Sequence, residues 1–179
     1  LNFLKQNKSI KNSSFKNELN KCYLGSEYTN DFIEEHLIKK NSLVKNYTFQ
    51  KLSDTDLYID IAKRISNNQV IGWFKGRCEW GPRALGNRSI LADARNPEIK
   101  DILNKKIKLR EAFRPFAPAV LEEFSDIYFD LNYPSPFMLN VVNAKKLAKD
   151  KVPSVVHADN TCRVQTVNKN NNYHFYNLI

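Results

Sequence analysis

The spacing of apolar and polar residues predicts helices in the first hundred residues. Apolar residues recur every three to four positions after Thr29 and after Ser53, which predicts helices that end near Lys40 and Asn67. The sequence Ser-Asp-Thr-Asp from Ser53 is typical of a helix N-terminus. Pro97 is well placed as the first residue of another helix, 97–107, with its apolar residues turned inward.

Runs of β-branched and other apolar residues between these helices predict short strands. We expect them at 70–74, 89–92, 119–122, 137–143 and 161–167. A short helix is expected at 123–129, and charged or polar connectors at 145–150 and 169–172. Helices and strands intermix without strict alternation, which predicts a mixed α/β (α+β) domain around a twisted sheet.

The two ends of the chain suggest how it is organised. Residues 1–21 are rich in Lys, Asn and Ser and contain one acidic residue, Glu18, so we expect a linker or arm followed by one domain over 22–179. The first residue is Leu1 and the only methionine is Met138. We therefore expect a piece of a longer polypeptide, and the apolar ending 173–179 predicts a domain that is incomplete at its C-terminus.

The composition fits a folded protein with a local excess of positive charge. Of its 179 residues, 42% are hydrophobic and the net charge is +9, and this apolar content is sufficient for a packed core. Residues 75–114 contain eleven Lys or Arg against five Asp or Glu. A concentrated excess of this kind favours an anion-binding site over a diffuse basic surface.

Other function classes find little support. The three cysteines lie far apart and the three histidines lack metal-ligand spacing, so neither a disulfide framework nor a metal site is expected. No apolar run approaches the roughly 20 residues of a membrane span. A reducing, cytoplasmic location without membrane contact fits best.

Arginine and glycine gather in one part of the chain. Six of the eight arginines lie between Arg77 and Arg114, and four of the five glycines lie between Gly72 and Gly86, whereas 20 lysines are spread more widely. Arginine grips carboxylate or phosphate with two bonds at once, and glycine lets the backbone approach a ligand closely. This segment therefore predicts a site for an anionic, phosphorylated small molecule.

The glycine spacing does not define a known phosphate loop. Gly76 and Gly81 have the spacing of a Walker A loop, but Pro82 and Arg83 stand where Lys and Ser or Thr are needed. Pro82 also lacks the N–H that would bind a phosphate. A dinucleotide-binding Gly-x-Gly-x-x-Gly is absent as well.

Individual residues of this region allow more than one interpretation. Arg83, in the middle of the loop, is favoured as an anion ligand. Arg114, in an apolar frame, needs an anion or a carboxylate because an unpaired buried charge is costly. The tryptophans Trp73 and Trp80 can stack on a base or pack in the core. By composition alone Arg163 is an ordinary surface arginine.

Five further residues of this segment form a secondary set of candidate ligands, and three of them also have a structural interpretation. Arg77 and Arg88 can bind an anion or pair with nearby carboxylates. Glu79 can act as an acid or base, position an amide, or pair with a neighbouring arginine. The complete secondary set is Arg77, Glu79, Asn87, Arg88 and Ser89.

Several blocks in order resemble the O-carbamoyltransferases of the nodulation and antibiotic-tailoring type. The blocks are 72–97, 113–122, 135–138 and 156–167, and the resemblance covers about 22–179. It implies an enzyme of two lobes. The N-terminal lobe resembles the Kae1 and sugar-kinase-like ATPases, carries a metal ion and transfers a carbamoyl group to the hydroxyl of a small-molecule acceptor.

The resemblance places this chain in the second lobe. That lobe resembles the YrdC/Sua5 fold and forms carbamoyl adenylate from carbamoyl phosphate and ATP. By motif, the arginines that bind carbamoyl phosphate map onto Arg83, Arg114 and Arg163. The family's later Asn-Thr-Ser-Phe-Asn block is absent, so we expect the isolated chain to be inactive.

A basic RNA-binding module of YrdC-like fold without catalytic activity is the alternative. YrdC-like surfaces are concave and positive, and the net charge is +9. The sequence contains neither an aromatic RNA-binding block nor an Arg/Lys repeat. Nucleic acid is therefore the less favoured ligand.

Overall fold

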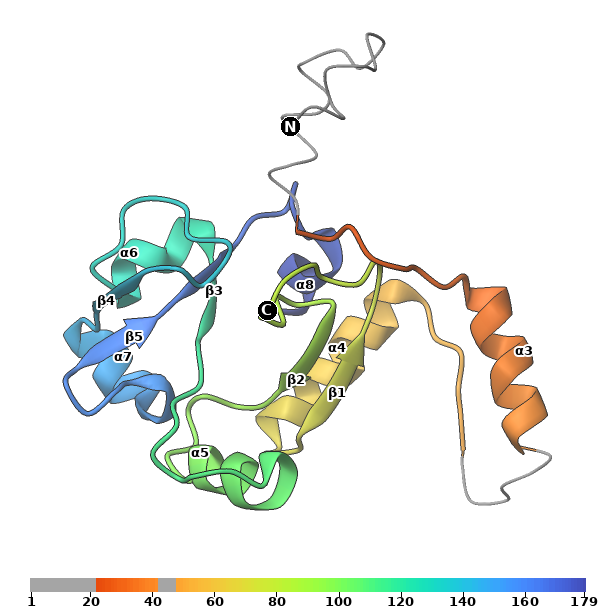
Figure 1. The fold of residues 1–179 in the computed structure, drawn as a ribbon, viewed down its shortest axis with the longest axis horizontal. Helices are drawn as coiled ribbons and strands as arrows, with labels where there is room; N and C mark the ends of the chain where they lie inside the picture. The colour runs from red at the N-terminus through yellow and green to blue at the C-terminus, as the bar shows by residue number, and fades with distance from the viewer. Residues whose placement is uncertain (1–21, 42–47) are drawn as a thin grey trace, which may run out of the picture.

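The structure is a computed structural model that describes residues 22–41 and 48–179 (Figure 1). The predicted arm, 1–21, lies outside these residues. The predicted mixed α/β class is confirmed. Both early helices form where the apolar spacing places them, as α3 (Asn30–Asn41) and α4 (Asp54–Ser66). Ser53 caps α4, because its hydroxyl accepts a hydrogen bond from the backbone N–H of Asp56 at 3.2 Å.

Six short strands pair as three separate ribbons. They are β1 (Ile71–Phe74), β2 (Arg88–Leu91), β3 (Ala119–Leu121), β4 (Val141–Asn143), β5 (Thr161–Arg163) and β6 (Gln165–Val167). β1 pairs with β2 and β4 with β5, both antiparallel, whereas β3 and β6 are parallel. The described residues therefore form three two-stranded sheets where one twisted sheet was expected.

The strand predicted over 161–167 is divided, and the reason lies in its partners. β5 pairs with β4, whereas β6 pairs with β3. Val164 lies between the two strands and is completely buried. The apolar pattern continues through Val164, so the sequence shows one strand where the fold needs two.

Short helical segments connect the strands. They are α5 (Ile99–Ile102), the π-helix η1 (Leu103–Lys108), η2 (Glu122–Phe124), α6 (Ser125–Tyr128), α7 (Lys146–Lys151), η3 (Pro153–Val155) and α8 (Tyr173–Leu178). The predicted connector at 145–150 is wrong, because α7 forms there and buries Ala148. The connector at 169–172 ends as predicted at Asn172, whose side chain accepts from the Phe175 N–H and caps α8.

Two apolar clusters form the core. One lies around β5 and α7 and contains Phe129, Leu131, Ala144, Ala148, Cys162 and Val164. The other joins α4, β1, β6 and α8 and contains Tyr58, Trp73, Val167, Phe175 and Leu178. Trp73 is thus a core residue. Burial raises the pKa of the Cys162 thiol to about 11, so it stays protonated and unreactive.

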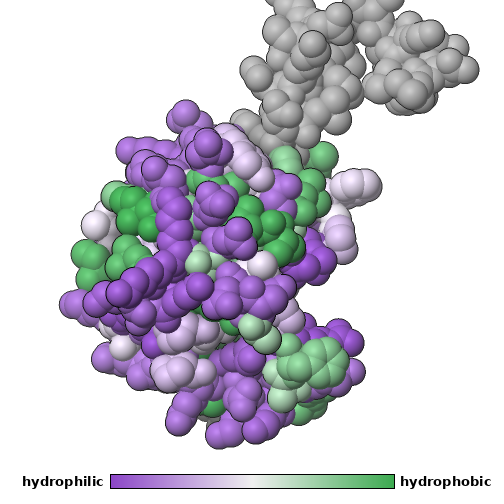
Figure 2. All heavy atoms as spheres, turned by 90° about the vertical axis from the view of Figure 1, so that its left-hand side faces the viewer, coloured by the Kyte–Doolittle hydropathy of each residue, from purple (hydrophilic) through white to green (hydrophobic). Residues whose placement is uncertain are grey.

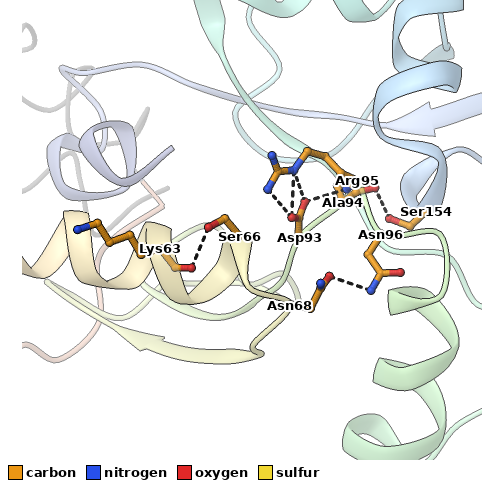
Figure 3. Close-up of polar contacts among 8 residues, drawn as sticks. All are labelled: Lys63, Ser66, Asn68, Asp93, Ala94, Arg95, Asn96 and Ser154. Atoms are coloured by element: carbon orange, nitrogen blue, oxygen red, sulfur yellow. Dashed lines mark hydrogen bonds and ion pairs between the residues drawn. The ribbon is translucent and has the colours of Figure 1, made fainter.

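Polar contacts fasten the connection between β2 and α5 (Figure 3). The guanidinium of Arg95 binds both carboxylate oxygens of Asp93, with a shortest distance of 2.6 Å. This pairing lowers the pKa of Asp93. Nearby, the Ser154 hydroxyl donates to the Ala94 carbonyl at 2.7 Å and ties the connection to η3.

The half of the molecule that carries α6, β4, β5 and α7 has a mixed surface. In Figure 2 its hydrophobic residues appear as separate patches among hydrophilic ones. Among the residues that the structure describes, no helix combines the length and apolar character required to cross a membrane.

Candidate anion-binding site

The carboxylate of Glu79 organises the loop between β1 and β2. Its Oε1 atom accepts hydrogen bonds from three backbone amides, those of Leu85 at 2.7 Å, Asn87 at 2.8 Å and Arg88 at 3.1 Å. A carboxylate is a strong acceptor for such amides. Glu79 therefore binds the backbone rather than a neighbouring arginine, and it fixes the turn that carries Arg83.

Asn87 joins this loop to the C-terminal helix. Its side chain is buried, donates to the Arg77 carbonyl at 2.8 Å and accepts from the amide of Asn172 at 2.9 Å. Asn172 is also the cap of α8. The secondary-set residue Asn87 thus has a structural role, since both ends of its amide are used within the protein.

Two further side chains, which no sequence motif singled out, also hold the loop. The amide of Gln165 and the hydroxyl of Tyr23 both donate to the Leu85 carbonyl, at 2.9 and 2.8 Å. Burial raises the pKa of the Tyr23 phenol, which keeps it a hydrogen-bond donor. No local motif marks these partners, because they come from segments distant in sequence.

Glycine is required where the loop meets α8. Gly86 has a φ of 104°, and a Cβ atom built there would lie 2.2 Å from Cδ1 of Phe175. Gly81, beside Pro82, has a φ of 116°. Side chains are disfavoured at such angles. The glycines therefore let the loop turn and approach α8 closely, while Arg83 remains exposed.

Arg88 is engaged by the protein itself. Its guanidinium donates to the carbonyls of Asn87 at 2.9 Å, Lys75 at 3.3 Å and Ser26 at 3.3 Å. Its Cζ atom lies 3.5 Å from the centre of the Phe74 ring, a cation–π contact. These contacts leave Arg88 as a tie between β1, β2 and the segment before α3.

The other secondary residues also have partners inside the protein. Arg77 donates to the Leu24 carbonyl at 3.4 Å, and the Ser89 hydroxyl accepts from the Gly86 N–H at 2.9 Å. Of the secondary set, all five residues therefore contribute to the conformation of the loop.

Arg163 and Arg83 form the part of the site that lacks a counter-charge. The Nε atom of Arg163 is buried and has no hydrogen-bond partner. Burial lowers the pKa of Arg163, and the nearby charge of Arg83 lowers it further. None of the ion pairs among the described residues includes either arginine. An anion between them would supply the missing acceptor and relieve the repulsion.

Arg114 is placed differently. Its Nε atom lies 2.8 Å from Oε2 of Glu111, and its side chain is 52% exposed. Its backbone carbonyl accepts from the buried amide of Asn104 at 2.9 Å. No contact in the described part of the chain joins Arg114 to Arg83 or Arg163. The convergence of all three arginines on one point remains a prediction.

Trp80 lies on the surface of the same loop. Its side chain is 75% exposed, so it is not a core residue. Its backbone N–H donates to the Cys22 carbonyl at 2.6 Å, which holds the turn in place. Trp80 and Arg83 are three positions apart in the sequence, so their Cα atoms lie within about 11 Å of each other.

The described residues do not form a metal-binding cluster. Within residues 22–41 and 48–179, no group of three or more His, Cys, Asp or Glu side chains is arranged to hold a metal ion. The fold and the site together define a mixed α/β domain with a hydrogen-bonded Gly/Arg loop and two neighbouring arginines that have no acceptor among residues 22–41 and 48–179. Such a site can bind a phosphate or carboxylate group.

Comparison with known proteins identifies the family of this domain. Residues 62–179 match the family described as Carbamoyltransferase C-terminus. The chain belongs to this family, which confirms the resemblance found in the sequence.

Named relatives agree with this assignment. The chain is 46% identical to nodulation protein NolNO of Sinorhizobium fredii over 127 residues, 67% of this chain and 19% of the relative. It is 42% identical to nodulation protein U of Rhizobium tropici over 115 residues, 64% of this chain and 20% of the relative.

A third relative matches over a greater part of the chain. Protein sll1178 of Synechocystis is 39% identical over 177 residues, 88% of this chain and 28% of that protein. The chain therefore spans less than a third of the length of these relatives.

Proposed function

We propose that this domain binds carbamoyl phosphate and ATP and forms carbamoyl adenylate within a larger carbamoyltransferase. The observation that carries the proposal is the buried Nε atom of Arg163, which has no partner among the described residues and lies near Arg83. Membership of the Carbamoyltransferase C-terminus family supports a phosphorylated carbamoyl donor as the ligand.

The arginines act by position and charge. In the proposed reaction, water hydrolyses carbamoyl phosphate to carbamate and inorganic phosphate. A carbamate oxygen then attacks the α-phosphorus of ATP, and pyrophosphate leaves. Arg83 and Arg163 bind the donor phosphate and stabilise the charge that develops on the phosphoryl oxygens. Arg114 joins them when an anionic ligand competes with Glu111 for its guanidinium.

Trp80 is a candidate platform for the adenine of ATP. An exposed tryptophan leaves a large apolar surface in water unless a ligand covers it. Its place on the loop of Arg83 puts the indole within reach of a nucleotide whose phosphates contact that arginine. Stacking of an aromatic side chain on a base contributes about 1–3 kcal/mol in single-stranded nucleic acid complexes.

The rest of the reaction belongs to the rest of the polypeptide. We propose that a Kae1-like N-terminal lobe of the same polypeptide carries the metal ion and transfers the carbamoyl group to the hydroxyl of a small-molecule acceptor, as the family resemblance implies. The three cysteines lie far apart in sequence and suit a reducing compartment, so we propose a cytoplasmic location.

The proposal is tested by binding measurements on arginine variants. Arg163→Lys and Arg83→Lys keep the charge but lose the planar fork, so each should weaken carbamoyl phosphate binding by about tenfold or more. Arg64→Lys is the matched control, because Arg64 pairs with Asp60 on the exposed side of α4. Equal binding by wild type and both site variants would contradict the proposal. Carbamoyl phosphate should also bind more tightly than inorganic phosphate.

A further inference from the structure

An apolar groove of about 800 Å³ lies between β2 and β3. Both strands line it, together with residues of α4 and α8, whereas no residue of β1 or β6 does so. Figure 1 shows β2 and β3 on opposite sides of the end of the chain, with no strand between them. The groove therefore lies along the outer edges of two ribbons.

The hydrogen-bond register shows that the edge of β3 is open toward the groove. The Gln165 N–H of β6 donates to the Pro118 carbonyl at 2.9 Å, so that carbonyl points toward β6. Peptide groups alternate in direction along a strand. The N–H and C=O of Ala119 and the N–H of Leu121 therefore point away from β6. Both residues line the groove.

β2 has an open edge for the same reason. The Lys75 N–H donates to the Asn87 carbonyl at 3.0 Å, which makes this pair hydrogen-bonded. Bonded and non-bonded pairs alternate in an antiparallel ribbon, so the pair Gly72 and Ile90 is non-bonded. Both backbone groups of Ile90 therefore point away from β1. The Arg88 N–H does the same, and it donates to Glu79.

Open strand edges beside an apolar groove are a template for an added strand. Backbone groups that point into an apolar space without partners are costly unless water or another chain satisfies them. Within the described residues, no hydrogen bond between backbone groups uses the N–H of Ile90, Ala119 or Leu121 outside their own ribbons. The groove thus offers donors on both walls and an apolar lining for side chains.

We propose that this groove binds an extended segment of the carbamoyltransferase polypeptide from outside residues 1–179. The segment pairs with Ile90 on one side and with Ala119 and Leu121 on the other. It thereby joins two of the three ribbons into one sheet, in the order β1, β2, segment, β3, β6.

The family relatives indicate where such a segment comes from. The chain spans 28% of the Synechocystis relative, so most of that polypeptide is available to supply the segment. The groove selects a segment with apolar side chains and with no proline at the paired positions. A stretch of about five residues, at roughly 3.3 Å per residue, is long enough to run alongside both β2 and β3. This inference does not depend on the reaction proposed for Arg83 and Arg163.

The test uses overlapping synthetic peptides that tile the part of the Synechocystis relative outside the matched stretch. Each is added to this chain while amide hydrogen exchange is followed by NMR. One peptide should slow exchange at Ile90, Ala119 and Leu121 by about tenfold or more and raise the melting temperature. The Val120 amide, which faces β6, should be protected already and change little.

A pair of variants separates strand binding from a general effect. Ile90→Lys places a charge where the segment would cover it, although Ile90 is 40% exposed in the open groove. It should keep the chain folded and abolish peptide protection. Ile59→Lys is the control, because Ile59 is 49% exposed on α4 and does not line the groove.

Two results would overturn the inference. Protection of the three amides by no peptide in the series is one. Protection that appears without peptide and grows with the concentration of the chain is the other, since a second copy would then be the occupant.

Discussion

Replacing Glu79 tests whether the anion-binding loop is held by one carboxylate. In Glu79→Ala the amides of Leu85, Asn87 and Arg88 lose their shared acceptor. Glu79→Gln keeps a carbonyl oxygen in the same place but removes the charge. The two variants therefore separate the loss of the acceptor from the loss of its charge.

The contacts give the expected size of each effect. A buried donor left without an acceptor costs about 1–3 kcal/mol, and three are affected. Since Glu79 is only partly buried, water can reach some of them, so we expect Glu79→Ala to lower the free energy of unfolding by about 3–5 kcal/mol. Hydrogen bonds to a charged group are roughly twice as strong as neutral ones, so Glu79→Gln should lose about 1–2 kcal/mol.

Urea denaturation followed by circular dichroism measures both values. Carbamoyl phosphate titrations under folding conditions should show a weaker affinity in the same order, because the carboxylate fixes the turn that presents Arg83. Glu34→Gln is a suitable control, since Glu34 pairs with Lys51 at the exposed surface. An unfolding free energy for Glu79→Ala within about 0.5 kcal/mol of wild type, the usual scale of surface substitutions, would refute the reasoning.

Three further outcomes follow from the same structure. Gly86→Ala should lower the free energy of unfolding by about 2–5 kcal/mol in a denaturant titration, because φ is positive and Phe175 lies 2.2 Å from the added Cβ. Burial first, and then the charge of Lys75, lower the pKa of His174 against the opposing pull of Asp54. The contribution of neutral His174 to the free energy of unfolding should therefore be fully present above the ordinary histidine pKa of about 6.5 and should be lost as the pH falls below it. In His174→Gln the melting temperature should depend less on pH across this range. ATP should quench Trp80 fluorescence, and Trp80→Phe should abolish most of that change while the buried Trp73 still emits.

Local patterns were sufficient for the elements that depend on local physics. The apolar period and the Ser53 cap predicted α4, and the apolar run before the glycines predicted β1. The division of 161–167 could not be predicted, because it depends on two partner strands that lie far away in sequence. The helix α7 was missed because its lysines suggested a connector, and only Ala148 faces the core.

The site shows the same division between local and distant information. The concentration of arginine and glycine indicated the loop, and the family motifs singled out Arg163, which composition alone did not. The roles of Glu79 and Gln165 depend on backbone groups brought together by the fold. The sequence could not distinguish the roles of Trp73 and Trp80, because the residues around them do not show which side chain is buried. In the structure Trp73 is buried and Trp80 is exposed.

The Nε–H group of Arg163 offers the most direct test of the proposed anion site. Its ¹⁵N and ¹H resonances should be followed by NMR while carbamoyl phosphate is added, with the exposed Nε–H of Arg64, which binds Asp60, as the internal control. We expect a saturable downfield shift and slower solvent exchange at Arg163, with no change at Arg64. An Arg163 signal that stays unchanged while other arginines respond would contradict the assignment of this buried, unpartnered group to the bound phosphate.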